Sequence, residues 1–426
     1  MKNIMKKALL VGAYSGSSGK HGCLESLKEL EALGETYGFT EFGYEACPIK
    51  KIDAATYIGE GKVQELQGIM VAESYDVLIF DEEISPNQQR NIEEIIKKPV
   101  IDRTGLIIEV FAQRAHTKEA RLQIESAKIR YELPRLKRLW THLSRQRTGG
   151  GGGGGGGGYL KGEGEKQIEI DRRILDRRLV GVEQEIKEVR AHRALQRQQR
   201  IRSSIPTFAI VGYTNAGKSS LLNSLTDANV LSEDKLFATL DTTTRRFQLP
   251  NHQNVLLIDT VGFIRKLPHK LIDAFRSTLE ESVYTDILLH VVDASHPEAL
   301  EQAMESIHVL EEIGAKNKPV ITVINKIDKV EDTKIVDELC YRYPHTVVIS
   351  TVTRQGYERL FELMTEMIQS LRKVMELRIP QSHYHVASEL MKEGRVLETE
   401  YEGNDILLTI EIPQNLEYKA LPYKKG

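Results

Sequence analysis

Five short apolar runs recur between Thr207 and Leu371 and alternate with amphipathic segments of helical period. In chain order the runs read TFAIVG, VLLID, ILLHVVD, VITVIN and TVVIS. Short runs without polar alternation are typical of strands buried on both faces, as in parallel sheets. The pattern therefore predicts a doubly wound α/β domain, with ligands expected at the carboxyl ends of its strands.

The 426-residue chain exceeds what one hydrophobic core supports, so several domains are expected. Near the N-terminus the strand-like runs ALLVGA, VLIFDEE and LIIEVFA alternate with helical patterns, and the tail reads as a strand, a helix and two more strands. We predict four parts: an N-terminal α/β subdomain (1–112), a long antiparallel helical hairpin (113–203) with a Gly-rich tip (148–164), the doubly wound domain (204–373) and a small α+β domain (374–426).

Two apolar stripes predict the helical hairpin, because their spacings, mostly of three and four residues, keep each stripe on one helix face. Between the stripes stand ten consecutive glycines (149–158), which have no side chains to pack and lose much backbone entropy on ordering, so we expect a mobile tip. Pro134 should kink or end the first helix. The stripes are Leu122, Ile129, Leu133, Leu136, Trp140 and Leu143, then Leu175, Leu179, Val182, Ile186 and Val189.

Charge is distributed unevenly along the chain. Residues 114–202 hold 22 Lys or Arg against 11 Asp or Glu, although the whole chain has a net charge of -3. This segment is a candidate polyanion binder; a solvated hairpin whose charges only keep it soluble is the alternative. Arg172, Arg173, Arg177 and Arg178 recur at helical spacing and could grip RNA phosphates. Their alternative role is pairing with carboxylates of the same helix, namely Glu169, Asp171, Asp176 or Glu185.

Composition and cysteine usage favour a soluble protein of a reducing compartment. No stretch approaches the roughly 20 apolar residues of a membrane span, so no transmembrane segment is expected. The cysteines (Cys23, Cys47 and Cys340) form no Cys-x-x-Cys pair, which argues against a disulfide framework or a zinc site. We expect a cytoplasmic protein, with a monomer as the default.

A phosphate-binding loop follows the first of the five apolar runs. Its sequence, Gly212-Tyr213-Thr214-Asn215-Ala216-Gly217-Lys218-Ser219, fits Gly-x4-Gly-Lys-Ser and leads into the helical stretch SLLNSL. The backbone amides and the helix N-terminus should cradle phosphates. Lys218 should reach the β- and γ-phosphates, and Ser219 should bind Mg2+.

Two further motifs select the nucleotide. Asp259-Thr260-Val261-Gly262 stands 41 residues after Lys218, where an aspartate can hold Mg2+ through water and a glycine amide can sense the γ-phosphate. Asn325-Lys326-Ile327-Asp328 ends a later strand, and its final carboxylate can accept two hydrogen bonds from the donor edge of guanine, which adenine lacks. The sequence therefore predicts that a Ras-like P-loop GTPase domain binds GTP and GDP.

The stretch between the loop and Asp259 is suited to a switch. Phe237-Ala238-Thr239-Leu240-Asp241 opens a polar, threonine-rich segment that could close over Mg2+ and the γ-phosphate, and spacing alone leaves open which threonine does so. Many GTPases orient the attacking water with a glutamine directly after Asp-x-x-Gly, whereas this chain has Phe263. We expect slow intrinsic hydrolysis; Phe263 could equally be an ordinary packing residue.

Two loops keep alternative interpretations. Asn215 stands where some GTPases hold a K+ ion that acts like an arginine finger, and the alternative is a side chain that bonds to the loop backbone. The N-terminal segment 12–20 looks like a second phosphate loop, but Tyr14 stands where a glycine is required. We interpret it as a strand-to-helix loop, with an RNA or weak nucleotide contact as the alternative.

Several longer motifs carry a resemblance to a known family. They are 57–63 (YIGEGKV), 101–105 (IDRTG), 111–114 (FAQR), 140–143 (WTHL) and 237–241 (FATLD). On these motifs the chain resembles the HflX family of translational GTPases, in the Obg-HflX superfamily, over nearly its whole length. The resemblance implies that the N-terminal subdomain and hairpin bind the large ribosomal subunit and its rRNA, and that the GTP-bound protein splits stalled ribosomes under stress.

The same resemblance assigns further roles to individual residues. It implies that Thr239 completes the Mg2+ shell and that Ser350, Thr351 and Val352 contact guanine. Two departures stand out: the tip reads LKGEGE (160–165) where the family has Arg-Gly-Pro-Gly-Glu, and threonine follows Asp241 where the family has proline. Lys161 in this tip is a further rRNA-binding candidate.

The sequence thus predicts Lys218, Thr239 and Gly262 as catalytic groups, and Ser219, Thr239 and, through water, Asp259 as Mg2+ ligands. Two functions of other classes stay open. One is a regulatory switch that acts on a protein partner or, by peripheral association, at the membrane surface. The other is an RNA remodeller driven by nucleotide.

Overall fold

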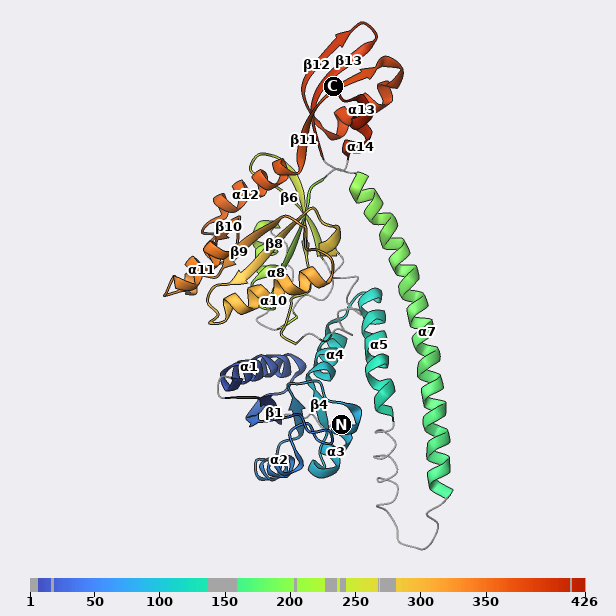
Figure 1. The fold of residues 1–426 in the computed structure, drawn as a ribbon, viewed down its shortest axis with the longest axis vertical. Helices are drawn as coiled ribbons and strands as arrows, with labels where there is room; N and C mark the ends of the chain where they lie inside the picture. The colour runs from blue at the N-terminus through green and yellow to red at the C-terminus, as the bar shows by residue number, and fades with distance from the viewer. Residues whose placement is uncertain are drawn as a thin grey trace. The chain divides into compact units, whose positions relative to one another are not determined.

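The structure is a computed structural model that describes residues 7–16, 19–136, 159–202, 205–226, 236–237, 243–266, 268, 281–413 and 416–425 (Figure 1). The chain divides into two compact units. The first unit comprises 1–190, 231–242 and 261–279, and the second comprises 191–230, 243–260 and 280–426. Residues 148–158 of the predicted Gly-rich tip and the stripe residues Trp140 and Leu143 lie outside the described residues, whereas residues 159–164 of the tip are helical.

A four-stranded parallel sheet organises the first unit. β1 (Lys7–Tyr14), β2 (Glu41–Pro48), β3 (Val77–Phe80) and β4 (Val100–Asp102) lie in the order β2-β1-β3-β4. α1 (Gly19–Tyr37) and α4 (Arg103–Arg114) cover one face of the sheet, and α2 (Glu60–Ala72) and α3 (Pro86–Ile96) cover the other (Figure 1). The strand order reverses between β1 and β3, so the switch point of this doubly wound sheet lies at their carboxyl ends.

The apolar run LIIEVFA (106–112), predicted above as strand-like, forms most of helix α4. The strand prediction was wrong. Leu106, Ile107, Ile108, Val110 and Phe111 are all buried, and a helix buried on nearly every side has the same apolar sequence as a buried strand. The residue before the helix favours the helical conformation, because the carboxylate of Asp102 caps α4 by accepting a 2.8 Å hydrogen bond from the Gly105 amide.

Asp102 also fixes the segment after the next helix. α5 (Lys118–Glu132) ends just before the short 3-10 helix η1 (Leu133–Arg135), which contains Pro134, so the predicted break is confirmed. The Tyr131 hydroxyl donates to Asp102 at 2.7 Å, and the Arg135 guanidinium donates to its other oxygen at 3.0 Å. Burial raises the pKa of Asp102, and Arg135 opposes that rise.

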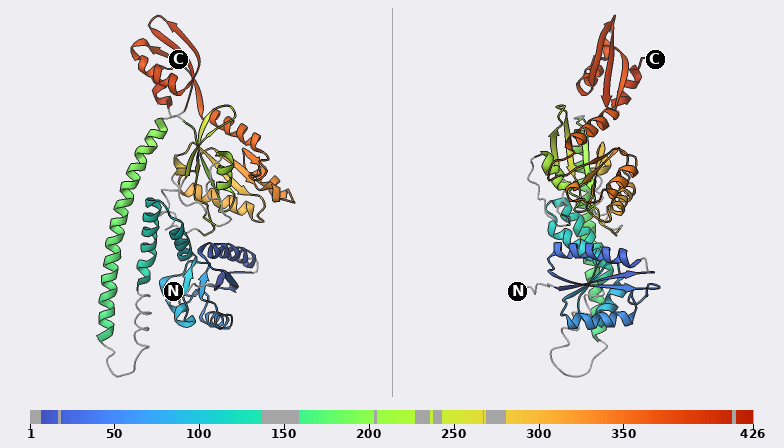
Figure 2. Two further views of the ribbon diagram at one scale, coloured as in Figure 1. Left: turned by 180° about the vertical axis from the view of Figure 1, so that it is seen from behind. Right: turned by 90° about the vertical axis from the view of Figure 1, so that its left-hand side faces the viewer.

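The second helix of the hairpin is α7 (Tyr159–Arg202), a single helix of 44 residues. α5 and α7 run antiparallel, since Lys118 pairs with Glu185 while Glu125 pairs with Arg178 (Figure 2). Leu122 packs against Val182 and Ile186, with Val189 beside them, so these members of the two predicted stripes do face each other. No helix in the described part of the chain combines the length and the apolar character that a membrane crossing requires.

A six-stranded sheet forms the core of the second unit, in the order β10-β9-β8-β5-β7-β6. The five predicted runs are its parallel strands β5 (Thr207–Gly212), β7 (Asn254–Asp259), β8 (Ile287–Asp293), β9 (Val320–Asn325) and β10 (Thr346–Val348). The antiparallel edge strand β6 (Thr243–Gln248) was not predicted; its sequence, TTRRFQ, is largely polar because most of its side chains are exposed. The helices are α8 (Lys218–Thr226), α10 (Ala299–Glu312), α11 (Lys334–Arg342) and α12 (Tyr357–Ser370), with the 3-10 turn η2 (Ile327–Lys329).

The chain ends in a small antiparallel sheet of order β11-β13-β12, as the predicted strand, helix and two strands require. β11 (Arg372–Pro380) leads through η3 (Gln381–His383) to α13 (Tyr384–Glu393), and β12 (Arg395–Glu402) and β13 (Asp405–Pro413) precede α14 (Glu417–Ala420) and η5 (Leu421–Tyr423). Alternate residues of β11 and β13 pack against α13 and form a separate apolar core. β12 is an edge strand, and Glu398, Glu400 and Glu402 on it are exposed.

Asp102→Asn should destabilise the first unit by about 3 kcal/mol, because it leaves the buried Arg135 guanidinium without its counter-ion. In urea unfolding followed by circular dichroism, the first unit should unfold at a lower midpoint, and the dependence of its unfolding free energy on urea concentration should be unchanged. Glu169→Gln is the control: it removes an exposed partner of Arg173 on α7 and should cost less than about 0.5 kcal/mol. Equal midpoints for the two variants would show that the Asp102–Arg135 ion pair does not stabilise the first unit.

Candidate functional site

The backbone of the predicted phosphate loop connects β5 to α8 in a conformation that requires two of its glycines. A Cβ at Gly212 would lie 2.2 Å from the Val291 carbonyl oxygen, and a Cβ at Gly217 would lie 2.2 Å from the side-chain nitrogen of Asn325. Both glycines also have positive φ, 143° and 97°. Asn215 has φ of 60°, a left-handed conformation that asparagine tolerates better than most residues. This conformation is by itself a reason for asparagine at the position, whether or not an ion binds there.

Lys218, Ser219 and Asp259 meet at the start of α8 and the end of β7. The Lys218 ammonium is buried and donates a 2.7 Å hydrogen bond to the Tyr213 carbonyl oxygen. Burial lowers the pKa of Lys218 to about 8, although Asp259 opposes that shift. The Ser219 hydroxyl donates to the Asp259 carboxylate at 2.7 Å, so the two oxygens that were assigned to Mg2+ are adjacent.

The buried side chain of Asn325 ties the phosphate loop to the loop after β10. Its amide nitrogen donates to the Ala216 carbonyl oxygen at 2.9 Å, and its amide oxygen accepts from the Thr351 backbone N–H at 3.2 Å. The Ser350 hydroxyl in turn donates to the Asp328 carboxylate at 2.6 Å and accepts from the Val352 amide at 3.2 Å. The structure therefore brings together the phosphate loop and both segments predicted to hold guanine.

One charged residue of this region was missed by the sequence reasoning. Asp293, at the end of β8, forms a 2.7 Å ion pair with Lys326, whose φ of 64° is left-handed. The sequence contains a signal for this residue, because Asp293 ends the apolar run ILLHVVD. The structure places it beside Asn325 on β9. A carboxylate at the carboxyl end of a parallel strand indicates a site residue, as it does for Asp259.

The predicted switch residues are only partly described. Ala238, Thr239, Leu240 and Asp241 lie outside the described residues, and so does the side chain of Lys161. Phe237 is buried, and its ring lies 4.4 Å, centroid to centroid, from the ring of Phe111 on α4.

The Asp-x-x-Gly segment is divided between the two compact units. Asp259 and Thr260 belong to the second unit, where the Thr260 hydroxyl donates to the Ile210 carbonyl oxygen at 2.7 Å. Val261 and Gly262 belong to the first unit, which includes 261–279. Phe263 is buried, so its environment is that of a packing residue.

The four arginines of α7 that were predicted to bind rRNA all have partners within the protein. Arg173 pairs with Glu169 at 2.6 Å and Arg172 with Asp176 at 3.8 Å, as the pairing alternative expects. Arg177 donates to the backbone of Arg173, and Arg178 pairs across the hairpin with Glu125. All four side chains are exposed, where such pairs contribute little and can be exchanged for other anions, so rRNA binding stays a prediction.

The N-terminal loop has the geometry of a strand-to-helix connection. A Cβ at Gly12 would lie 2.6 Å from the Cys23 sulfur on α1, so this glycine serves helix packing. The Ala13 amide, which a phosphate loop would offer to a phosphate, donates instead to the Glu82 carboxylate at 3.2 Å. A carboxylate therefore already fills the anion position of this loop.

A glycine loop between strand and helix, a lysine and serine beside a strand-end aspartate, and an Asn-Lys-x-Asp turn together define a P-loop GTPase. Family models agree along the chain. The model described as "50S ribosome-binding GTPase" matches residues 207–326, that described as "GTP-binding GTPase N-terminal" matches 24–112, and that described as "GTP-binding GTPase Middle Region" matches 114–200.

Individual relatives match over nearly the full length. The chain is 44% identical over 418 residues to the GTPase HflX of Chlamydia pneumoniae, covering 98% of this chain and 88% of the relative. It is 39% identical over 393 residues to the GTPase HflX of Escherichia coli K12, covering 92% and 90%. A solved GTP-binding protein from the archaeon Sulfolobus solfataricus, in complex with GDP, covers 85% of this chain and 98% of its own at 29% identity and a TM-score of 0.44. The chain belongs to the HflX family of GTPases, enzymes that hydrolyse GTP.

Asp328→Asn should weaken GTP binding by at least about 100-fold, because guanine would lose two charge-assisted hydrogen bonds, while the weak binding of ATP should not fall. Calorimetry with GTP, GDP and ATP measures this. Asp332→Asn is the matched control, since Asp332 is exposed, lies four residues further on and pairs with Lys334. Unchanged GTP affinity in Asp328→Asn would exclude this carboxylate as the group that recognises guanine.

Proposed function

We propose that this GTPase binds the large ribosomal subunit in its GTP-bound state and splits stalled ribosomes under stress. Membership of the HflX family supports the proposal, and so does the match of residues 207–326 to a family described as a 50S ribosome-binding GTPase. The observation that carries it is the hairpin, which presents exposed arginines on one long helix within a segment that holds 22 basic against 11 acidic residues. Such a surface suits the phosphates of rRNA.

Magnesium belongs to the same proposal. Ser219 and Asp259 offer a hydroxyl and a carboxylate oxygen side by side, and hard oxygen ligands are what Mg2+ prefers. We infer that Ser219 binds the ion directly, that Asp259 acts through water and that Thr239 adds a further oxygen. Bound there, the ion would neutralise charge on the β- and γ-phosphates. K+ at Asn215 is retained as a separate proposal, to be tested by turnover in K+ against Na+.

The remaining steps fall to the residues of the chain. Lys218 would stabilise negative charge on the β- and γ-phosphates, and the loop amides would orient these phosphates. The Gly262 amide would contact the γ-phosphate. Phe263 cannot orient the attacking water, because its side chain is buried and has no polar group. We therefore propose that the ribosome orders the water or supplies the missing group, an effect worth about 10^3- to 10^5-fold in other GTPases.

Two other functions are weighed in the same experiments. A switch that acts on a protein partner or at the membrane surface would bind its nucleotide and yet ignore ribosomes. An RNA remodeller would turn over with free duplex RNA as well as with subunits. A cytoplasmic location is part of the proposal, and the three cysteines, all free thiols, are in keeping with a reducing compartment.

The chain should pellet with large ribosomal subunits when a non-hydrolysable GTP analogue is bound and should stay largely in the supernatant with GDP. Its GTP turnover should rise by at least about 10^3-fold on adding subunits. Sedimentation through sucrose and phosphate release measure the two effects. Pelleting that is equal with both nucleotides, or turnover that is indifferent to ribosomes, would refute the proposal.

Replacing Arg172 and Arg177 together by glutamine should weaken subunit binding and lower the slope of log affinity against log salt by about 2, because each arginine that neutralises a phosphate adds about one unit to that slope. The matched control is Arg359→Gln on α12, because Arg359 is also exposed and paired, with Glu362 and Glu366. An unchanged slope in the double variant would mean that these arginines serve only pairing within the helix.

A further inference from the structure

Three consecutive acids (81–83) follow β3 at the switch point of the N-terminal sheet, and the first two of them form the acid pair. Asp81 and Glu82 directly follow β3, next to the carboxyl end of β1, which is where a doubly wound sheet receives its ligand. Asp81 is fully buried and Glu82 mostly so. Asp81 accepts from the Ser26 hydroxyl at 2.7 Å and from Arg103 at 2.6 Å, and Glu82 accepts from the Ala13 amide.

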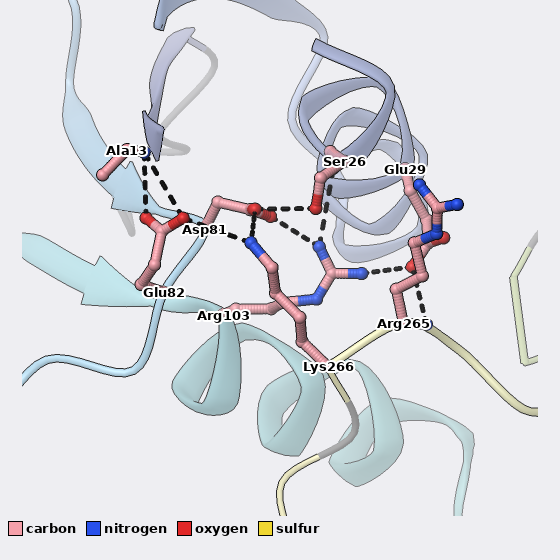
Figure 3. Close-up of polar contacts among 8 residues, drawn as sticks. All are labelled: Ala13, Ser26, Glu29, Asp81, Glu82, Arg103, Arg265 and Lys266. Carbon is pink, nitrogen blue, oxygen red and sulfur yellow. Dashed lines mark hydrogen bonds and ion pairs between the residues drawn. The ribbon is translucent and has the colours of Figure 1, made fainter. Parts of the chain in front are cut away.

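The position of the ligand is taken by Lys266, whose ammonium lies between the two acids (Figure 3). It forms ion pairs with Asp81 and, at 3.1 Å, with Glu82. The preceding residue is held as well, because the Arg265 amide donates to Glu29 at 3.1 Å, and Glu29 also pairs with Arg103. All of these residues belong to the first compact unit, so the contact is internal to it.

Two cations, Arg103 and Lys266, balance the charge of the acid pair. Burial disfavours the charge of Asp81, yet Arg103 and Lys266 hold its pKa below the usual range. Burial raises the pKa of Glu82 even with Lys266 beside it. The pKa of Lys266 is raised in turn, because the two carboxylates outweigh its own desolvation. These shifts accompany the two ion pairs by which the acid pair holds the segment that carries Lys266.

That segment adjoins the GTPase machinery. Lys266 follows Gly262, the glycine of Asp-x-x-Gly, by only four residues, and the intervening Phe263 and Ile264 are buried. A residue pinned so close to Gly262 limits where the Gly262 amide can go, since four residues span at most about 13 Å.

Helix α4 supports the acid pair and also contacts Phe237. Its first residue, Arg103, binds Asp81 and Glu29, and two turns later Phe111 packs against Phe237. Phe237 stands two residues before Thr239, the predicted switch threonine. Arg103 of the motif 101–105 and Phe111 of the motif 111–114 therefore have structural contacts that GTP binding alone does not explain.

We propose that the acid pair forms a docking site for residues 262–266, and that Lys266 is a positioning residue whose release accompanies GTP binding. In the docked state these residues belong to the first compact unit. Contact between the Gly262 amide and the γ-phosphate would draw on the same residues, so docking and GTP compete, whereas GDP has no γ-phosphate to compete for them. The inference rests on GTP binding by the chain and is independent of the ribosome.

The test is the ratio of two affinities, for a non-hydrolysable GTP analogue and for GDP, measured by calorimetry on the full chain. Lys266→Met removes the charge at similar size and should shift the ratio toward the GTP analogue by roughly 5-fold. Lys266→Arg keeps the charge and should stay within about 2-fold of the unaltered protein. Lys128→Met is the matched control, because Lys128 is comparably exposed and ion-paired, with Glu109, and should leave the ratio unchanged.

A second variant separates coupling from a general loss of structure. Glu82→Gln keeps an acceptor for the Ala13 amide and should shift the ratio in the same direction, and the variant that combines it with Lys266→Met should shift it no further than the larger single change. An unchanged ratio in Lys266→Met, a shift toward GDP, additive effects, or Lys266→Arg behaving like Lys266→Met would each overturn the proposal.

Discussion

The side chain of Asn325 is the interaction on which the nucleotide site depends. It is fully buried at the end of β9, and its two hydrogen bonds join the Ala216 carbonyl of the phosphate loop to the Thr351 amide of the guanine loop. Its nitrogen also fills the space that a side chain at Gly217 would need. The phosphate loop and the guanine loop, which are far apart in the sequence, are therefore joined in one packed structure.

Much of the fold and of the site could be predicted from the sequence, because the residues that form each strand or motif are neighbours in the chain. The five strands of the second unit were found as contiguous runs, and the phosphate loop was found as an eight-residue motif. The failures have physical reasons. Helix α4 is buried on nearly every side, so its sequence lacks the alternation of apolar and polar residues that marks a helix. The edge strand β6 has no apolar face, because most of its side chains are exposed to solvent.

What sequence could not supply are the pairs of charges that the fold brings together. Lys266 meets Asp81, Arg135 meets Asp102 and Arg178 meets Glu125. In sequence each of these looks like an ordinary surface charge. Burial in the folded chain changes the energetics of Asp81 and of the Arg135–Asp102 pair, whereas Arg178 and Glu125 stay exposed. The switch threonine, Thr239, and the rRNA-binding arginines were assigned from spacing and resemblance, and they stay predictions.

The edge strand of the C-terminal sheet bears on how two copies of the chain would meet. β12 presents an open row of backbone donors and acceptors to which a second β12 could pair. In such a pairing Glu398, Glu400 and Glu402 of one copy would stand opposite the same acids of the other, and the register shift between Val396 and Glu398 would interrupt the ladder. The strand is thus poorly suited to pairing with a second β12, which disfavours a dimer formed through this edge.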